Sequence, residues 1–480
     1  MSLAALSSPP LPESLFFPTL RRAVVVGAGV VGMAVARVLS ERFDQVVLVE
    51  RDHLNHEQPE HRRGVQQSVH IHNLMRRGQE ELEGLFPGFH DVAVLLGATQ
   101  IDHGRDVARC SDVGFCPLFE TGFRSLSATR ALLEYAQRER LRVLTRNVIW
   151  LEGTRALGLI AKRAGDALHV IGVRTDHAAA HEIRAALVVD CSGRSFLWKR
   201  WFNELGVESP KETVVDSQCG YASRFYRPRE PVQGGCTAMM VDPLYPVRPQ
   251  WGVIVPVEHG RWLVTLGGFN GMYPPSEEAE FERFGERLQT PLFSAWLSQA
   301  EPISPVRTFR RLEMRWNHFE DQKRPLAGFL AVGDSAWAHN PLYGQGMSIG
   351  VTCARILGDV LREDASIDEL GQRYYRAARR FAHPPWQACS LLDFAWPKTE
   401  GARPWYAGLA RRIGHTTLRA AQFDREVYLA MLRGAHLDAS PAEVLTPRVL
   451  YGLARYQLGR AMGSLPPTHL DRLPTPEPRA

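Results

Sequence analysis

Residues 24–32 read VVVGAGVVG, an apolar run that passes directly into three closely spaced glycines. Gly27, Gly29 and Gly32 match the pattern G-x-G-x-x-G between a predicted strand and a predicted helix. The first glycine lets the chain turn, the second lets a pyrophosphate approach the backbone, and the third lets helix and strand pack closely. Glu50 ends the next apolar run, near the spacing of about 20 residues expected for a carboxylate that binds ribose hydroxyls. The segment therefore predicts a dinucleotide site.

A second glycine-rich segment, AVGDSAWAHNPLYGQGMSIG at residues 331–350, indicates which dinucleotide is bound. An apolar strand ends at Asp334, and a helix begins near Gly346 after a loop that contains Pro341 and Gly344. A carboxylate at the strand end can bind the hydroxyls of a ribityl chain, and the helix N-terminus can stabilise the negative charge of a reduced flavin. A nicotinamide enzyme needs neither feature, so the segment favours FAD.

Between these segments the pattern predicts an α/β unit that is interrupted by a β-rich insert. The apolar run 185–190 is a further element of the strand-then-helix kind. From about Tyr221 to Asn270 the chain becomes rich in Val, Trp, Tyr and Thr. Residues 251–257 alternate and return through the turn 258–260, which indicates a β-hairpin.

Helical spacing follows the insert in two places. Residues 276–299 form the first such region, and residues 366–462 form the second. Ser366 and Glu369 fit the capping box S-x-x-E at the start of the second region.

The composition is that of an ordinary soluble enzyme. Of 480 residues, 45% are hydrophobic and 23% are charged, and the net charge of +5 gives no reason to expect a nucleic-acid partner. The seven cysteines are scattered and never form C-x-x-C, which argues against a disulfide framework or a zinc site and favours a reducing cytoplasm. No stretch approaches the ~18 apolar residues that a transmembrane helix needs.

Several segments resemble a known superfamily. The segment 331–350 resembles the second FAD signature of flavoproteins similar to para-hydroxybenzoate hydroxylase, and LVVDCSGRS at 187–195 resembles the strand between the two signatures. Closer likeness is to bacterial flavin epoxidases of polyether polyketide pathways and related natural-product monooxygenases. It is carried by HRRGVQQSVHIHNLM (61–75), SATRALLEY (127–135), VPVEHGRWLVTL (255–266) and NPLYGQGMS (340–348).

The resemblance implies an α/β fold: a glutathione-reductase-like Rossmann unit for FAD, an inserted β-rich substrate unit and a helical C-terminal region. The expected divisions are a disordered leader (1–20), a discontinuous FAD-binding unit (21–220 and 326–390), the β-rich substrate unit (221–325), C-terminal helices (391–465) and a frayed tail (466–480).

The resemblance also implies the site residues. Contacts with FAD are expected from Gly27, Gly29, Val31, Gly32, Glu50, Arg51, Arg63, Arg130, Asp190, Gly193, Asp334, Pro341, Gly346 and Met347. The residues expected beside the isoalloxazine ring are Pro341, Gly344, Gln345, Gly346 and His72, and no metal ligand is expected.

The sequence leaves two routes for reduction of the flavin. Aromatic hydroxylases that use NADPH directly carry an Asp-Gly pair in the central segment, where this chain has Ser192-Gly193. We therefore expect NAD(P)H as the donor, either directly or through a separate flavin reductase.

Some of these residues also have plainer explanations. A metal site would need a carboxylate or Cys at ligand spacing from the histidines, which is absent, so a polar or flavin-proximal loop is favoured for His53, His56, His61, His70 and His72. Without the resemblance, Arg130 would be assigned to the surface. Trp251 and Trp262 fit a sheet core as well as a pocket. The arginines Arg411, Arg412 and Arg419 are expected to be solvated rather than membrane-bound.

These inferences predict an FAD-dependent monooxygenase, an epoxidase or hydroxylase of secondary-metabolite (antibiotic) biosynthesis. It would insert one oxygen atom from O₂ into a small apolar or aromatic substrate through a flavin hydroperoxide, which requires no side-chain nucleophile. The main alternative is a prenyl-lipid reductase of the geranylgeranyl-reductase type. A flavin-dependent halogenase uses an early lysine and W-x-W-x-I-P, but no lysine precedes Lys162 here. A retained flavin fold that serves as a non-catalytic binding module is a third alternative.

Overall fold

The computed structural model describes Leu15 and residues 21–477, apart from 166, 231–234, 311, 324 and 364. The expected leader, residues 1–20, therefore lies outside the described residues except for Leu15, which is buried.

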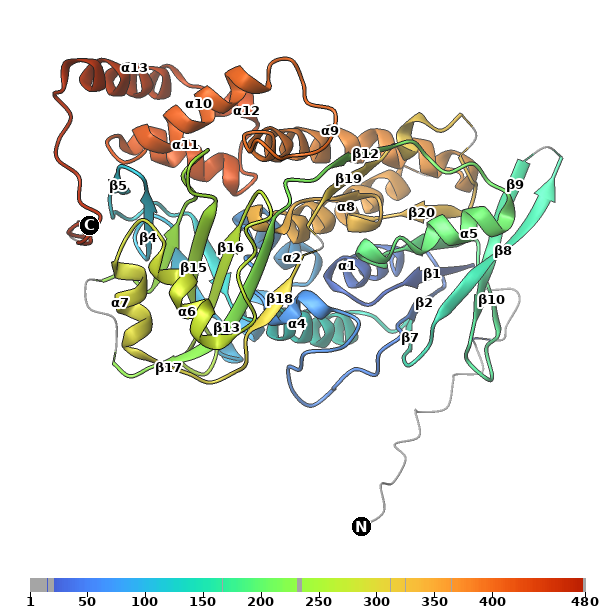
Figure 1. Ribbon diagram of the computed structural model, residues 1–480. Coiled ribbons are helices and arrows are strands. Elements are labelled where there is room, and N and C mark those ends of the chain that lie inside the picture. The colour runs from blue at the N-terminus through green and yellow to red at the C-terminus, as the bar shows by residue number, and fades with distance from the viewer. Residues whose placement is uncertain are drawn as a thin grey trace, which may run out of the picture.

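A five-stranded parallel sheet organises one half of the molecule, on the right of Figure 1. Its strand order is β20–β11–β1–β2–β7, so the predicted strand-then-helix elements meet in one sheet with β11 between β1 and β20. The strands β1 and β2 are buried along their whole length, as expected for a parallel sheet covered on both faces. The strands are β1 (Arg22–Val26), β2 (Gln45–Val49), β7 (Val148–Leu151), β11 (Leu187–Asp190) and β20 (Phe329–Ala331).

Helices α1 (Val30–Leu39) and α8 (Gly346–Arg362) pack closely because glycines line their contact. A Cβ atom built at Gly350 would lie 2.4 Å from Val31 Cγ2, and one built at Gly333 would lie 3.1 Å from Val31 Cγ1. Since Val31 lies in the first turn of α1 and Gly350 at the start of the second turn of α8, the N-terminal parts of the two helices lie together.

A mixed sheet of eight strands forms the other half, on the left of Figure 1. The predicted hairpin is confirmed: β15 and β16 are antiparallel, with Val257 opposite Arg261. The sheet also includes β4 and β5, which lie outside the expected substrate unit 221–325. The strands are β4 (Val107–Ser111), β5 (Gly114–Phe115), β13 (Gly220–Pro228), β14 (Ala238–Val241), β15 (Gln250–Val257), β16 (Arg261–Gly268), β17 (Ala300–Pro302) and β18 (Arg307–Phe309).

Three smaller sheets contain the remaining strands. The hairpin of β8 and β9 carries β10, the strand β19 lies between β12 and β21, and β3 pairs with β6. Their strands are β3 (Thr99–Asp102), β6 (Arg124–Ser127), β8 (Ala156–Ala164), β9 (Ala167–Thr175), β10 (Glu182–Arg184), β12 (Glu212–Val215), β19 (Met314–Asn317) and β21 (Trp337–Ala338).

The C-terminal region is helical as predicted and lies along the upper edge in Figure 1. Helix α9 begins after Ser366, whose side chain accepts from Glu369 N, and continues without a break across the expected division at residue 390. The other helices are α2 (Arg76–Leu85), α3 (Phe89–Leu95), α4 (Arg130–Leu144), α5 (Leu197–Leu205), α6 (Glu278–Glu286), α7 (Leu292–Ser298), α9 (Ile367–Asp393), α10 (Ala407–Ala420), α11 (Arg425–Ala435), α12 (Pro441–Val444) and α13 (Pro447–Met462). Among the described residues, no helix is both long and apolar enough to cross a membrane.

The expected frayed tail, in its described part 466–477, contacts the rest of the molecule at a few points. Leu470 and Leu473 pack against the core of the eight-stranded sheet, and Thr290 Oγ1 donates to Leu470 O at 2.5 Å.

We expect the substitution Gly350→Ala to lower the free energy of unfolding by about 1–3 kcal/mol, because the added methyl would overlap Val31 and separate α1 from α8. Urea unfolding measures this change. Gly84→Ala is the matched control, since a Cβ atom there meets nothing within 4 Å, and it should be neutral or stabilise by up to about 1 kcal/mol. Equal destabilisation by both variants would contradict the assigned contact.

Candidate functional site

The N-terminus of α1 has the form of an anion site. Its N-cap is Gly29, and the described side chains leave this helix end without a cap or an acidic residue in the first turn. At Gly27 and Gly32 an added Cβ atom would lie 2.7 Å from Cys191 O and 1.8 Å from Gly27 O, so packing alone requires glycine there. At Gly29 it would meet only side-chain atoms at 3.6 Å or more. Glycine at 29 therefore leaves room for a ligand to approach the backbone from outside.

Two arginines face this helix end. The atom nearest to the Cβ position of Gly29 is Arg130 Nη2 at 3.6 Å, and Arg62 Nη2 lies at 3.9 Å. Arg130, the first residue of α4, is buried and donates to Glu134 Oε1 at 2.8 Å, so the surface role is excluded. Burial alone would raise the pKa of Glu134, but Arg62 and Arg130 lower it to about 2. The arrangement holds two guanidinium groups ready for a diphosphate.

Glu50 lies where the ribose carboxylate was predicted. Its Oε2 accepts from Ala28 N at 2.8 Å and pairs with Arg62 Nη1 at 2.9 Å. Arg62 was not predicted, because the sequence alone does not distinguish it from its neighbour Arg63, which the resemblance had selected. Only the fold turns Arg62 inward and leaves Arg63 exposed.

A hollow of about 710 Å³ adjoins these groups. The predicted cofactor residues Arg51 and Arg63 line it together with Arg62 and Glu134. Arg51 Nη2 also donates to Gly64 O at 2.9 Å. The hollow is large and polar enough for part of a dinucleotide, and the cofactor contacts of Arg51 and Arg63 stay predictions.

Asp334 lies beside the N-terminus of α8. A Cβ atom built at Gly346 would lie 3.5 Å from Asp334 Oδ1, and Arg194 Nε lies 3.6 Å from Asp334 Oδ2. Burial raises the pKa of Asp334, whereas Arg194 and Arg130 lower it. Arg194 was not singled out from the sequence. It also donates to Glu313 O at 2.8 Å and to His339 O, so it links the central segment to the loop after Asp334.

The predicted flavin-facing loop has the required backbone form. Asn340 Oδ1 accepts from Leu342 N, Gly344 has a φ of +66°, and α8 starts at Gly346 without a side-chain cap from the described residues. Gln345 has its side chain elsewhere: Nε2 donates to Ala435 O at 3.1 Å, so any flavin contact from it would be through the backbone. Met347 packs against the main hydrophobic core.

A fully buried carboxylate, Asp393, anchors this loop from the end of α9. Tyr343 Oη donates to Asp393 Oδ1 at 2.7 Å, and Asn340 Nδ2 lies 3.2 Å from both carboxylate oxygens. Burial raises the pKa of Asp393 to about 7, although these donors lower it. No motif pointed to Asp393, since an acid near a helix end is usually on the surface.

Asp190 and Gly193 lie close to the glycine turn of α1. The fully buried Asp190 accepts from Ser192 N at 2.8 Å and from Trp198 N at 3.0 Å, which holds the turn into α5. Gly193 has a φ of +62° and open space at its Cβ position. Their contact with the cofactor stays a prediction.

His70 and His72 point in different directions. His72 Nδ1 lies 3.0 Å from His70 O, and burial together with Arg130 lowers the pKa of His72 to about 3. The ring of His70 meets Tyr221 edge-on at 4.7 Å, and its Nδ1 lies 2.8 Å from Ser223 Oγ. Burial lowers the pKa of His70 to about 4.

A cluster of mostly aromatic side chains adjoins the flavin-facing loop, and we call it the aromatic cluster. Its buried members are Cys219, Tyr221, Trp251, Phe269, Leu312 and Trp396, and Tyr245, Val253, Phe309 and Leu342 pack against them. Leu342 belongs to the loop itself. Trp251 thus lies near the site, whereas Trp262 stacks on Trp296 at 5.8 Å within the core of the eight-stranded sheet.

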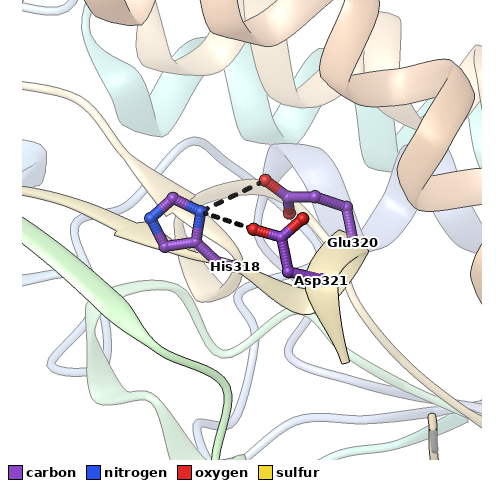
Figure 2. A group of neighbouring side chains, drawn as sticks. All are labelled: His318, Glu320 and Asp321. Carbon is purple, nitrogen blue, oxygen red and sulfur yellow. Dashed lines mark ion pairs between the residues drawn. The ribbon is translucent and has the colours of Figure 1, made fainter. Parts of the chain in front are cut away.

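A separate group of polar side chains, His318, Glu320 and Asp321, directly follows strand β19 (Figure 2). Figure 2 shows the imidazole facing both carboxylates, with Nδ1 at 3.4 Å from Glu320 and 3.6 Å from Asp321. Such a group could in principle bind a cation, but Arg379 Nε lies 3.6 Å from Glu320 Oε1. Two further arginines, Arg376 and Arg380, line the adjoining hollow. These positive charges already balance the carboxylates, so we assign the group to ion pairing with α9.

The residues therefore fit FAD on structural grounds. An uncapped helix end with two arginines suits a diphosphate, and Glu50 suits a ribose. Asp334 and the second uncapped helix end, on α8, suit the ribityl chain and the flavin ring. Gly29 leaves the backbone at the start of α1 open, since a Cβ atom there would contact only side-chain atoms at 3.6 Å or more.

Comparisons with known proteins agree with this geometry. A family model described as "FAD dependent oxidoreductase" matches residues 22–360. The Mycobacterium tuberculosis protein Rv3254 is 28% identical over 395 residues, which cover 78% of this chain and 80% of that protein. Kynurenine 3-monooxygenase of Chaetomium globosum is 27% identical over 149 residues, which cover 28% of this chain and 29% of that protein.

Solved structures share the fold at low sequence identity. p-Nitrophenol 4-monooxygenase PnpA from Pseudomonas putida DLL-E4 has a TM-score of 0.60 at 20% identity, covering 87% of this chain and 97% of that one. The flavin-dependent brominase Bmp2 has a TM-score of 0.64 at 13% identity, covering 92% and 99%. At such identities the likeness concerns the fold, and the predicted α/β fold with its β-rich and helical additions is confirmed.

We expect Arg130→Leu to weaken FAD binding by about tenfold to a hundredfold, because a charge-assisted contact with the diphosphate is lost. Quenching of flavin fluorescence gives the dissociation constant. Arg142→Leu, in the last turn of the same helix α4 and with its side chain 32% exposed, is the matched control and should leave the affinity unchanged. Unchanged affinity in Arg130→Leu would contradict the assignment.

Asp393 should make stability depend on pH. Its folded pKa of about 7 exceeds the unfolded value, so the native state holds an extra proton between pH about 4 and 7. Relative to Asp393→Asn, the wild-type free energy of unfolding should fall by up to about 1.4 kcal/mol per pH unit across this window and then level off above it. Urea unfolding of both proteins from pH 5 to 8 measures this. Parallel pH profiles would show that Asp393 titrates normally.

Proposed function

The chain belongs to the FAD-dependent oxidoreductase family, and from this premise we propose that it is a monooxygenase that inserts one oxygen atom from O₂ into an apolar organic substrate. The proposal rests on the position of the aromatic cluster. This cluster packs against Leu342 in the flavin-facing loop, and the same loop leads into α8. An apolar, water-poor compartment at the flavin end of the site is what this chemistry requires.

FAD would be held by residues from three parts of the chain. The diphosphate would bind at Gly29 with Arg130 and Arg62, the ribose at Glu50, and the ribityl chain at Asp334. Bound and reduced, the cofactor supplies the activation of O₂. The protein residues would position the substrate and exclude water from the reacting atoms.

The network around Asp393 would keep the loop in position. Because Asp393 binds both Tyr343 and Asn340, the backbone between them cannot shift without breaking buried hydrogen bonds. Such rigidity favours a constant distance between the flavin-facing loop and a substrate that lies against Leu342. Asp393 is thus a positioning residue in this proposal.

Among oxygen insertions, we favour the epoxidation of an alkene. Hydroxylation of a phenol benefits from a base near its hydroxyl group. The imidazoles in this region are weak bases, because burial lowers the pKa of His70 to about 4 and of His72 to about 3. An alkene needs no such base, and the likeness to natural-product epoxidases points in the same direction, toward secondary metabolism.

The names of the similar proteins support oxygen insertion and also suggest a rival activity, halogenation. Kynurenine 3-monooxygenase and PnpA carry names that state oxygen insertion, and Bmp2 is named as a brominase. Halogenation is disfavoured because all five lysines lie at the surface: Lys162, Lys211, Lys323 and Lys398 are exposed, and Lys199 pairs with Glu212 at 3.0 Å. A prenyl-lipid reductase would share the apolar site but would not consume O₂.

The reduced flavin would come from NAD(P)H. With Ser192-Gly193 in the central segment, a separate flavin reductase is the route that we favour. Bleaching of the bound flavin by NADPH without any reductase would show the direct route instead.

Incubation of the FAD-loaded, chemically reduced protein with apolar alkenes under ¹⁸O₂ tests the function. We expect a product heavier by one ¹⁸O atom, detected by mass spectrometry, because the oxygen comes from O₂ rather than water. The same mixture under nitrogen is the control and should give no product. A gain of two hydrogens under nitrogen would replace the proposal with the reductase.

A further inference from the structure

Large apolar side chains at the surface are concentrated on the C-terminal helices. The described residues include fifteen exposed large hydrophobic side chains, and nine of these lie within residues 392–462, a segment of 71 residues in a chain of 480. They are Leu392, Trp405, Leu409, Ile413, Leu445, Leu450, Tyr451, Leu458 and Met462. Single exposed apolar residues are ordinary, but such a concentration marks an interaction surface.

The exposed residues follow helical stripes. Leu409 and Ile413 are four residues apart on α10, with exposed fractions of 62% and 49%, and Trp405, which is 93% exposed, lies in the turn just before this helix. Leu450 and Leu458 are eight residues apart on α13. Each set therefore lies on one side of its helix.

The two helices belong to one surface. Gln457 Nε2 of α13 donates to Thr416 Oγ1 of α10 at 3.1 Å, so the helices are in contact. Figure 1 shows both at the upper left edge of the molecule, with α13 outermost. We call α10, α13 and the exposed residues named above the C-terminal face.

The charge of this face has one sign. Helices α10 and α13 contain six arginines and no Asp or Glu. Arg419, Arg448 and Arg455 have carboxylate partners on neighbouring elements, at Asp112, Glu426 and Asp424. The other three, Arg411, Arg412 and Arg460, have none among the described residues. Arg412 is exposed, whereas Arg411 and Arg419 are partly buried in contacts with Tyr245 and Asp112. The sequence alone favoured solvated arginines over membrane-bound ones, and exposure does not distinguish the two.

We propose that the C-terminal face docks onto the surface of an anionic lipid bilayer. Apolar stripes flanked by arginines are the pattern of helices that lie in the membrane interface, where Trp and Leu enter the acyl boundary and Arg meets the headgroups. A second copy of the chain fits less well, because a symmetric contact would bring arginines against arginines. The face attaches peripherally.

Docking would bring lipid close to the proposed substrate site. Arg411 Nη1 donates to Tyr245 Oη at 2.8 Å, and the ring of Tyr245 lies 5.3 Å from that of Trp396 in the aromatic cluster. An apolar substrate dissolved in the bilayer would then have a short path to the site. This link rests on the proposed function, whereas the docking itself does not.

Co-sedimentation of the FAD-loaded full chain with vesicles tests the proposal. We expect binding to vesicles of phosphatidylglycerol and phosphatidylcholine, weaker binding in high salt, and little binding to phosphatidylcholine alone. Arg412→Ala should lower the partition coefficient about fivefold, as expected for about 1 kcal/mol per basic residue. The double variant Trp405→Ser/Leu409→Ser should lower it at least about tenfold.

The matched controls are Leu95→Ser and Val143→Ser, which remove equally exposed apolar side chains, 87% and 70%, from another part of the surface. They should bind vesicles like the wild type, and thermal unfolding should show that all variants are folded. Equal binding to both kinds of vesicle, or none, would overturn the proposal. So would a dimer in light scattering that Trp405→Ser/Leu409→Ser converts to monomer. Oxygen insertion into a water-dispersed alkene is measured without vesicles, so its outcome is independent of this one.

Discussion

The contact between α1 and α8 is the constraint on which the site depends. Val31 packs against positions where only glycine leaves room, Gly333 and Gly350, and the two helices therefore start side by side. Each helix end presents unpaired N–H groups and a partial positive charge. A long anionic cofactor can meet both ends only if their separation is fixed, and the glycine contact fixes it.

Much of the fold could be predicted from short stretches of sequence, because the features that specify it involve residues close together in the chain. A glycine turn between strand and helix, a hairpin turn and a serine cap each act within a few residues. The recruitment of β4 and β5 into the eight-stranded sheet could not be foreseen, because pairing between Ala238 and Val107 joins residues far apart in the chain. The docking of Leu470 and Leu473 is likewise a long-range effect.

The residues of the candidate site also fall into those that the sequence could predict and those that it could not. The positions of Gly29, Glu50 and Asp334 were predictable, since each lies at the end of a strand or a helix, and their contacts with the cofactor stay predictions. Arg62 and Asp393 were not, because their importance comes from burial beside groups on other elements. Sequence patterns identify where a backbone offers a site. They do not identify which distant charged side chains the fold turns toward it.

The charges around Gly29 explain why the helix end matters so much. In the free protein, Arg62 and Arg130 are engaged by Glu50 and Glu134, so carboxylates hold the guanidinium groups in place and also offset part of their charge. A diphosphate that enters must share the arginines with these acids. The remaining attraction comes from the N–H groups in the first turn of α1, for which the described residues provide no side-chain cap. Preorganisation by Glu134 and attraction by the helix are thus complementary, and neither alone would hold the cofactor in a defined position.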